Sequence, residues 1–243
     1  MRVPARVLVM AVESPATSAD VSAASPRGQA VEPSRLIAER AYQELRDRIV
    51  TLRLPPGTVL REDELMGELR IGRTPLREAV KRLVLENLVA VQPRRGTTVT
   101  DVDAADIVHI TEVRAELEAF AAYLAALRMD APMRADGQAL LDELGQLDTS
   151  QSALMEFDER VHRFIWNAGR NPYLAQTLER YFVLSLRVWY IVLDRVPGLG
   201  GVVHDQARLL EAVLAHDVAG ARALMREHVL AFQREVIAAF SRP

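Results

Sequence analysis

Residues 61–101 read REDELMGELRIGRTPLREAVKRLVLENLVAVQPRRGTTVTD, and this stretch decides the fold of the chain. Its pattern predicts a helix, a tight turn at Arg70-Ile71-Gly72, a second helix and then a two-stranded hairpin. The second helix begins at Arg73-Thr74-Pro75, where proline fits because its missing N–H would have no helical partner there. This order of elements is typical of a winged helix-turn-helix, a module that binds double-stranded DNA.

The second of these helices has an apolar face and a basic face when its residues are spaced about 100° apart. The apolar arc can pack on neighbouring helices and consists of Leu76, Ala79, Val80 and Leu83. The opposite arc carries cations and one hydroxyl and consists of Arg73, Thr74, Arg77, Lys81 and Arg82. Arginine suits bidentate contact with guanine edges or phosphates. Taken alone, this stripe is explained equally well as a solvated helix face.

The hairpin that follows favours DNA binding over a solvated face. Pro93-Arg94-Arg95-Gly96 lies between two strand-like segments, Leu88–Val91 and Thr97–Val102. Two arginines at the tip of a hairpin suit a wing that contacts phosphates or enters a minor groove. The basic helix and the basic tip therefore predict one DNA-binding face.

Residues 41–101 resemble the DNA-binding domain of GntR-type bacterial transcription regulators. The matching pieces are AYQELRDRIVTLRLPPGTVL, EDELMGELRIGRTPLREAVKRL and NLVAVQPRRGTTV, and RTPLREA together with LPPG is quite specific. The resemblance implies that Arg73, Thr74 and Arg77 contact operator DNA and that Gly96 belongs to the wing turn. We expect Lys81, Arg94 and Arg95 to contact mainly phosphates.

This chain departs from that family's pattern at two positions. Gly72 stands where the family usually has Ser or Thr, and glycine is the weaker N-cap. Some members carry a DNA-contacting arginine at the position of Asp63. A carboxylate cannot make that contact, so we expect a different operator preference.

Charge is distributed unevenly over the 243 residues, whose formal net charge is −3. Residues 34–102 carry thirteen Lys and Arg against ten Asp and Glu, whereas residues 103–243 carry fourteen against twenty. This division predicts a basic DNA-binding module joined to an acidic module with another task. The chain has no cysteine, which excludes disulfides, thiolate zinc sites and cysteine nucleophiles.

The pattern predicts three regions: a disordered tail over residues 1–33, a winged helix-turn-helix over 34–102 and a helical domain over 103–243. The tail is rich in Ser, Ala and Pro after a short apolar stretch that Glu13 interrupts. No apolar run reaches the length of a membrane span, so we expect a cytoplasmic protein without a membrane partner.

Helical periodicity dominates from Asp103 onward and predicts a mainly α fold, with a bundle of about six helices after the winged helix. The expected helices are Asp106–Met129, Gly137–Leu147, Gln151–Ala168, Pro172–Arg195, Asp205–Ala215 and Ala219–Phe240. Pro197-Gly198-Leu199-Gly200-Gly201 marks a break between two of them.

Several polar residues lie on the apolar arcs of these helices. Asp158 and His162 are four residues apart and so are neighbours on one face; His228 and Gln206 lie on the apolar arcs of two other helices. His204 projects to the opposite side of its helix. Each group could be a satisfied core residue, but several on separate helices favour a shared metal or anion site.

Residues 106–240 resemble the all-helical effector domain, the FCD domain, of the FadR-type branch of these regulators. The matching pieces are VRAELEAFAA, FDERVHRFIWNAGRNPYL and ARLLEAVLAHDVAGARALMREHV. The resemblance implies a divalent metal of the zinc or nickel type held by Asp158, His162 and His228. The remaining family histidine falls on Gln206, a weak ligand because such ions prefer imidazole. Other members of the branch bind no metal.

The two resemblances together predict a homodimeric DNA-binding regulator that is not an enzyme and acts as a repressor released by a small carboxylate effector. Arg114, on the inward arc of its helix, is expected to clamp the effector carboxylate. The alternative for this residue is a buried ion pair with Glu116 or Glu118. Two other functions stay open: a metal-dependent hydrolase using Asp158, His162 and His228, and an architectural DNA binder without a ligand.

Overall fold

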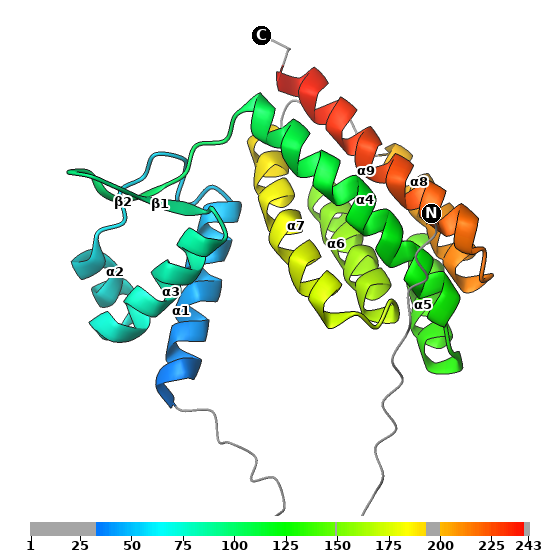
Figure 1. Cartoon of the computed structure of the whole chain (residues 1–243), viewed down its shortest axis with the longest axis horizontal. Coiled ribbons are helices and arrows are strands. Elements are labelled where there is room, and N and C mark those ends of the chain that lie inside the picture. The colour runs from blue at the N-terminus through cyan, green and yellow to red at the C-terminus, as the bar shows by residue number, and fades with distance from the viewer. Residues whose placement is uncertain (1–32, 149, 193–199, 241–243) are drawn as a thin grey trace, which may run out of the picture. The chain divides into compact units, whose positions relative to one another are not determined.

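The computed structural model describes residues 33–148, 150–192 and 200–240. Within them the chain forms nine helices and one two-stranded hairpin, so the predicted mainly α fold is confirmed (Figure 1). The expected N-terminal tail, apart from Pro33, lies outside the described residues, as does most of the break predicted around Pro197. None of the helices in the described ranges is long and apolar enough to cross a membrane.

The first part of the chain has the elements of a winged helix. These are α1 (Pro33–Val50), α2 (Glu62–Leu69), α3 (Arg73–Leu85), β1 (Val89–Gln92) and β2 (Gly96–Val99). The strands are antiparallel and pair from Val89 with Val99 to Gln92 with Gly96, which puts Arg94 and Arg95 at the tip. The predicted turn, second helix and hairpin are therefore present.

The turn between α2 and α3 depends on local backbone geometry. Arg70 ends α2 in the left-handed region with φ 53°, and its N–H bonds to the carbonyl of Met66. Gly72 precedes α3 with no side-chain cap, as expected for a residue without a hydroxyl. Leu76, Ala79 and Leu83 then face inward and are completely buried, whereas Val80 is only half-buried. The apolar arc of α3 thus anchors it and leaves the other arc at the surface.

Six helices form the rest of the described chain, as the periodicity predicted. They are α4 (Ala104–Arg128), α5 (Ala131–Leu144), α6 (Gln151–Ala168), α7 (Pro172–Val192), α8 (Gly200–Leu214) and α9 (Val218–Phe240). Helices α4 and α9 pack side by side along much of their length (Figure 1). Their buried side chains, with those of α6, α7 and α8, form the core of the bundle.

Two predicted helix starts were wrong. Helix α5 begins at Ala131, where Asp130 accepts the N–H of Met133 and Pro132 occupies the first turn. Gly137, the predicted start, lies inside this helix, where a Cβ would come within 2.7 Å of the Phe164 ring. Helix α8 begins at Gly200, inside the predicted break, although glycine is a poor helix former. The start of α5 follows the local signal of Asp130 and Pro132, which the prediction overlooked, whereas α8 begins despite the low helix propensity of its two first glycines.

Helix α7 contributes to two separate cores. Phe182 belongs to the core of the bundle, whereas Val183, the next residue, belongs to the core formed by α1, α3 and the hairpin. On the same helix Arg187, which is fully buried, donates hydrogen bonds to the hydroxyl and the carbonyl of Thr100, one residue after β2. One helix therefore contacts both the bundle core and the winged helix.

Candidate functional site

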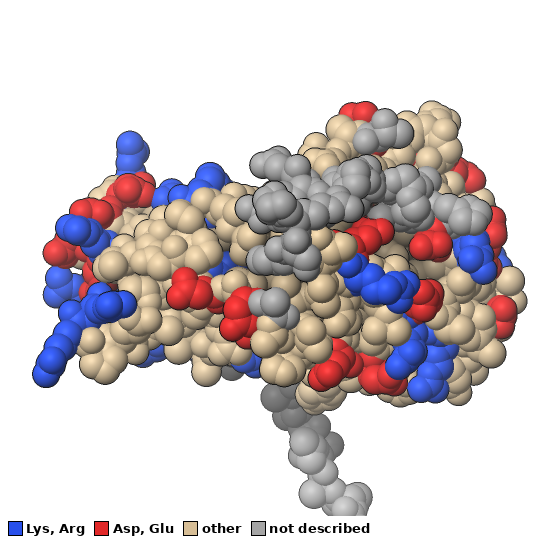
Figure 2. All heavy atoms as spheres, turned by 90° about the horizontal axis from the view of Figure 1, so that it is seen from above, with Lys and Arg blue, Asp and Glu red and all other residues tan. Residues whose placement is uncertain are grey.

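The basic arc of α3 and the hairpin tip are at the surface. The exposed residues among those predicted to contact DNA are Arg73, Thr74, Arg77, Lys81, Arg94, Arg95 and Gly96. Gly96 has φ 81°, a left-handed conformation that favours glycine, which fits its predicted place in the wing turn. Figure 2 shows Lys and Arg side chains standing out from this part of the chain, with acidic side chains beside them.

Arg82 lies on the predicted basic arc but has a structural environment. Its guanidinium lies 3.7 Å from the centre of the Tyr42 ring and forms an ion pair with Glu39 of α1. Tyr42 in turn donates a hydrogen bond to Glu86 at 2.7 Å. These contacts connect α3 to α1. Arg82 therefore stabilises the winged helix, and its guanidinium is engaged by Tyr42 and Glu39.

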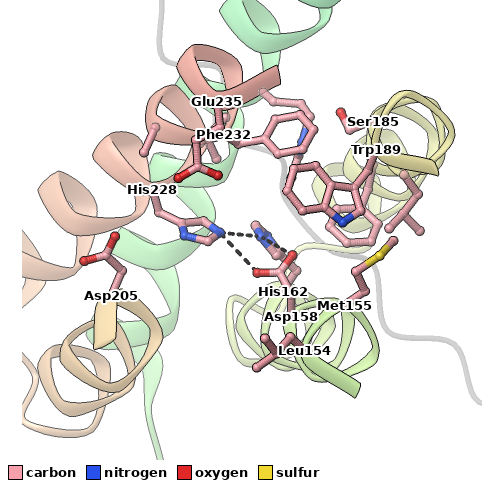
Figure 3. A pocket seen from close by; sticks show the side chains of 15 residues that line it. Leu154, Met155, Asp158, His162, Ser185, Trp189, Asp205, His228, Phe232 and Glu235 are labelled. Atoms are coloured by element: carbon pink, nitrogen blue, oxygen red, sulfur yellow. Dashed lines mark hydrogen bonds and ion pairs between the residues drawn. The ribbon is translucent and has the colours of Figure 1, made fainter. Parts of the chain in front are cut away.

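The bundle encloses a second site, a cavity of about 100 Å³ with walls from α4, α6, α7, α8 and α9 (Figure 3). Its apolar lining is formed by Leu154, Met155, Phe182, Leu186, Trp189, Val229, Ala231 and Phe232. Its polar lining is formed by Arg114, Asp158, His162, Ser185, Asp205, His228 and Glu235. An apolar cavity with a few converging polar groups is the usual form of a small-molecule site.

Asp158, His162 and His228 converge in this cavity. Their nearest ligand atoms all lie within 4.8 Å of one another. Nε2 of His228 is 3.2 Å from Oδ1 of Asp158 and 3.2 Å from Nε2 of His162 (Figure 3). The structure thus brings together the three residues that the sequence placed on the apolar arcs of two helices.

The charges of this cluster stabilise one another. Burial opposes ionisation of Asp158, but the charges of His162 and His228 outweigh it and hold the pKa of that carboxyl well below its usual range. Burial likewise opposes charge on His228, but its hydrogen bond to Asp158 outweighs burial and raises its pKa. The 3.2 Å contact between the two imidazoles is a hydrogen bond in which one ring donates, and the same two nitrogens could instead bind a metal ion when both are deprotonated.

Glu118 of α4 organises the residues behind the cluster. It is completely buried and accepts three hydrogen bonds: from Nδ1 of His162 at 3.0 Å, from Nη2 of Arg114 at 2.9 Å and from Nε1 of Trp166 at 2.6 Å. Burial would raise its pKa, but the charge and hydrogen bond of His162, the charge of Arg114 and the hydrogen bond of Trp166 lower it to about 2. A carboxylate at Nδ1 keeps the proton there and leaves Nε2 of His162 to face the cavity.

Sequence reasoning named Glu118 only as a possible partner of Arg114. The missed signal was its spacing, because Glu118 follows Arg114 by one helical turn and shares its inward arc. Glu116, the other predicted partner, instead pairs with Arg226 at the surface.

Of the two predictions made for Arg114, the structure confirms the buried ion pair, and the effector clamp stays a prediction. Arg114 forms the buried ion pair with Glu118, and it also lines the cavity, where its guanidinium carbon lies 5.0 Å from the centre of the Phe182 ring. The side chain is almost fully buried, and its Nε has no hydrogen-bond partner within the described residues. A buried guanidinium with an unpaired N–H can donate a hydrogen bond to a further anion.

Gln206 does not line the cavity but touches its edge. The residue is 1% exposed, and its Nε2 donates a 2.5 Å hydrogen bond to Oδ1 of Asp158. Its Oε1 is buried and unpaired among the described groups. Gln206 is therefore positioned to orient Asp158 through its N–H. The side chain of His204 lies outside the described residues, so its predicted direction is not tested.

The two parts of the chain match two family models. Residues 37–99 match the model of bacterial regulatory proteins of the gntR family, and residues 109–231 match the FCD domain. The chain belongs to the GntR family of regulators. It is 35% identical over 199 residues to the HTH-type transcriptional repressor GlaR of Escherichia coli (strain K12), covering 78% of this chain and 90% of that protein.

Solved structures support the fold of this GntR-family chain. E. coli McbR/YncC matches with a TM-score of 0.73 at 23% identity, covering 84% of this chain and 99% of that one. A GntR transcriptional regulator from Rhodococcus sp. RHA1 matches with a TM-score of 0.65 at 20% identity, covering 83% and 97%. The GntR-family chain is thus a DNA-binding transcription regulator with an FCD domain.

We expect Glu118→Gln to destabilise this GntR-family chain. The amide would leave Arg114 as a buried charge without its carboxylate, which costs about 3–5 kcal/mol of the free energy of unfolding. Urea denaturation measures the change. Glu116→Gln is the matched control on the same helix: its carboxylate is exposed, so the change should stay within about 0.5 kcal/mol. Equal stability of the two variants would contradict the role given to Glu118.

Proposed function

We propose that this regulator is a repressor that works as a homodimer in the cytoplasm, with its operator affinity controlled by a small carboxylate bound in the bundle. Residues 34–102 would form the DNA-binding domain and residues 103–243 the effector domain. The observation that carries the proposal is Arg114, a buried guanidinium with an unused N–H in the wall of an apolar cavity. GlaR, a relative covering most of the chain, is named a transcriptional repressor.

On the DNA side, Arg73, Thr74 and Arg77 contact base edges or phosphates of the operator. Their exposure on the outward arc of α3 supports this role, since the second helix of such a motif lies in the major groove. Lys81, Arg94 and Arg95 contribute mainly phosphate contacts, and Gly96 permits the wing turn that presents two of them.

On the effector side, Arg114 binds a carboxylate through the part of its guanidinium that Glu118 does not use. The cavity around it suits a small ligand: its volume is about 100 Å³, and an engineered protein cavity of about 150 Å³ holds benzene. Phe182 and Trp189 offer apolar surface for the carbon skeleton.

A divalent metal of the zinc or nickel type would be held by Asp158, His162 and His228. Two imidazole nitrogens and one carboxylate oxygen are the donors that such ions prefer, and their convergence within 4.8 Å fits one ion. When bound, the metal would supply a Lewis acid that attracts an anionic ligand. Glu118 orients His162 and Gln206 orients Asp158, while Gln206 itself is at most a weak ligand.

Helix α7 supports coupling between the effector and DNA. Phe182 and Trp189 line the cavity, whereas Val183 packs in the core of the winged helix and Arg187 bonds to Thr100. A ligand that favours one position of α7 would therefore favour one arrangement of the DNA-binding segment. The cavity favours a ligand-controlled regulator over an architectural DNA binder without a ligand. Membership of the GntR family favours a regulator over a metal-dependent hydrolase.

A stripe on α4 supports the homodimer. Val113, Phe120 and Leu127 repeat every seven residues and so lie on one face, and they are 37%, 41% and 53% exposed. Three large apolar side chains in a row on an exposed helix face suit an isologous contact with a second copy.

The DNA-binding assignment predicts different effects for two basic residues. Arg77→Ala should weaken operator binding by about 1–3 kcal/mol, because a bidentate base contact is lost. Lys81→Ala should weaken binding to operator and to random DNA alike and reduce the salt dependence, because one phosphate contact is lost. Fluorescence anisotropy at several salt concentrations measures both. If Arg73→Ala and Arg77→Ala leave operator binding unchanged in folded protein, α3 is not the recognition helix.

The effector assignment is tested best by Arg114→Lys, which keeps a positive charge beside Glu118 but loses the planar fork. Small mono- and dicarboxylates that release wild type from DNA should need at least about tenfold higher concentration with this variant, a difference of about 1.4 kcal/mol. Arg226→Lys is the control, because Arg226 pairs with Glu116 at the surface. An unchanged response of Arg114→Lys would remove Arg114 from the effector site.

The metal assignment predicts that Gln206→His binds nickel or zinc more tightly than wild type, by roughly tenfold, because imidazole replaces an amide. Calorimetric titration of protein purified without a histidine tag measures the affinity. Gln206→Asn, which keeps the amide and adds no imidazole, should show no such gain. If neither wild type nor Gln206→His binds either metal, the cluster is a metal-free polar pocket.

The dimer assignment predicts that Phe120→Glu shifts the chain toward monomers, because a charge would be buried in the contact. Sedimentation velocity at micromolar concentration measures the change. Tyr173→Glu is the control, since Tyr173 is 83% exposed at the start of α7, away from the α4 stripe. Dimers of undiminished stability in Phe120→Glu would rule out this face.

A further inference from the structure

Acidic residues of α2 lie against the arginines of the recognition helix. Nε of Arg77 is 3.2 Å from both carboxylate oxygens of Glu62. The same carboxylate is 3.8 Å from Nε of Arg73, whose Nη2 lies 3.6 Å from Oδ1 of Asp63. All four side chains are substantially exposed, so these contacts occur on the surface that would meet DNA.

Glu62 is placed to set the direction of the Arg77 guanidinium. Its carboxylate occupies the Nε side, and the two terminal nitrogens have no hydrogen-bond partner within the described residues. Those terminal N–H groups form the fork that can contact the O6 and N7 atoms of a guanine. With the Nε side occupied, the end of the fork is the part left for a base.

Glu62 also offsets repulsion between the two arginines. Arg73 and Arg77 are four residues apart on one helix, so their like charges disfavour a common direction. A carboxylate between the two guanidiniums reduces this repulsion and allows both to lie on the exposed arc of α3. Glu64, the third acidic residue of the same turn, pairs instead with Arg61 at 3.6 Å and contacts neither.

We propose that Glu62 is a specificity-determining positioning residue, which directs Arg77 and Arg73 toward base edges and disfavours their use on phosphates of unrelated DNA. The inference rests on the proposed contacts of these arginines with the operator. At the operator, each arginine keeps its contact with Glu62 while its free N–H groups bind a base. On random DNA, an arginine that turns to a phosphate loses that contact and leaves a carboxylate near the backbone.

The strength of the contacts suits this role. Exposed ion pairs contribute about 0.2–1 kcal/mol each, so they bias a side chain without locking it. That range corresponds to up to about fivefold in an equilibrium constant, at about 1.4 kcal/mol per factor of ten. Glu62 would therefore adjust the ratio of specific to nonspecific affinity and contribute little to folding.

The experiment compares two affinities for each full-length variant. One is for a duplex that the wild type selects from a random pool, and the other is for a scrambled duplex of the same composition. Glu62→Gln should lower the ratio of these affinities by about fivefold, because Arg77 loses its guide. Glu64→Gln removes the same charge from the same turn and should leave the ratio within about twofold.

A double-mutant cycle separates this inference from the proposed recognition itself. In the Arg77→Ala background, Glu62→Gln should change the ratio by much less than it does alone, because the residue it acts through is absent. Equal effects of Glu62→Gln and Glu64→Gln would reduce Glu62 to a general negative charge and overturn the proposal. A large loss with Arg77→Ala but none with Glu62→Gln would also overturn it, while leaving the recognition helix in place.

Discussion

The polar side of the cavity depends on the hydrogen bonds that the buried carboxylate of Glu118 accepts. A lone carboxylate in a helical core is strongly unfavourable, so its three hydrogen bonds bind it to Arg114, His162 and Trp166. Each partner is thereby fixed in direction. His162 directs Nε2 toward His228, and Arg114 lies in the cavity wall with its Nη2 held by Glu118. The polar groups of the cavity are preorganised by a residue that does not line it.

The two candidate sites use charge in opposite ways. In the bundle, ion pairs are dry and strongly coupled, and the cost of removing one partner is large. On α3, the ion pairs with Glu62 and Asp63 are exposed to solvent and weak, so contacts with DNA could replace them at little cost. The proposed ligand site is thus rigid, and the proposed DNA-contact surface of the same chain is adaptable. The difference follows from solvent exposure rather than from residue type.

Much of this could be predicted from the sequence. Periodicity located the bundle helices and placed Asp158, His162 and His228 on inward arcs, and the RTPLREA segment located the recognition helix. Partners within the fold could not be predicted, because they depend on how helices pack. Nothing in the spacing of Glu62 and Arg77, or of Glu118 and Trp166, says that they meet. The starts of α5 and α8 were also missed: the prediction overlooked the capping signal of Asp130 and Pro132 before α5, and glycine's low helix propensity disfavoured the observed start of α8.

Arg187 has a consequence for how the chain unfolds. Its guanidinium is buried and its hydrogen bonds go to the hydroxyl and the carbonyl of Thr100. Burial lowers its pKa to about 10, although the charges of Asp101 and Asp106 oppose this shift. Pulling the winged helix away from α7 would leave this guanidinium without those two hydrogen-bond acceptors. The two segments, though matched by separate family models, are therefore not energetically independent. Their melting should be cooperative, with neither part reaching its full stability when expressed alone.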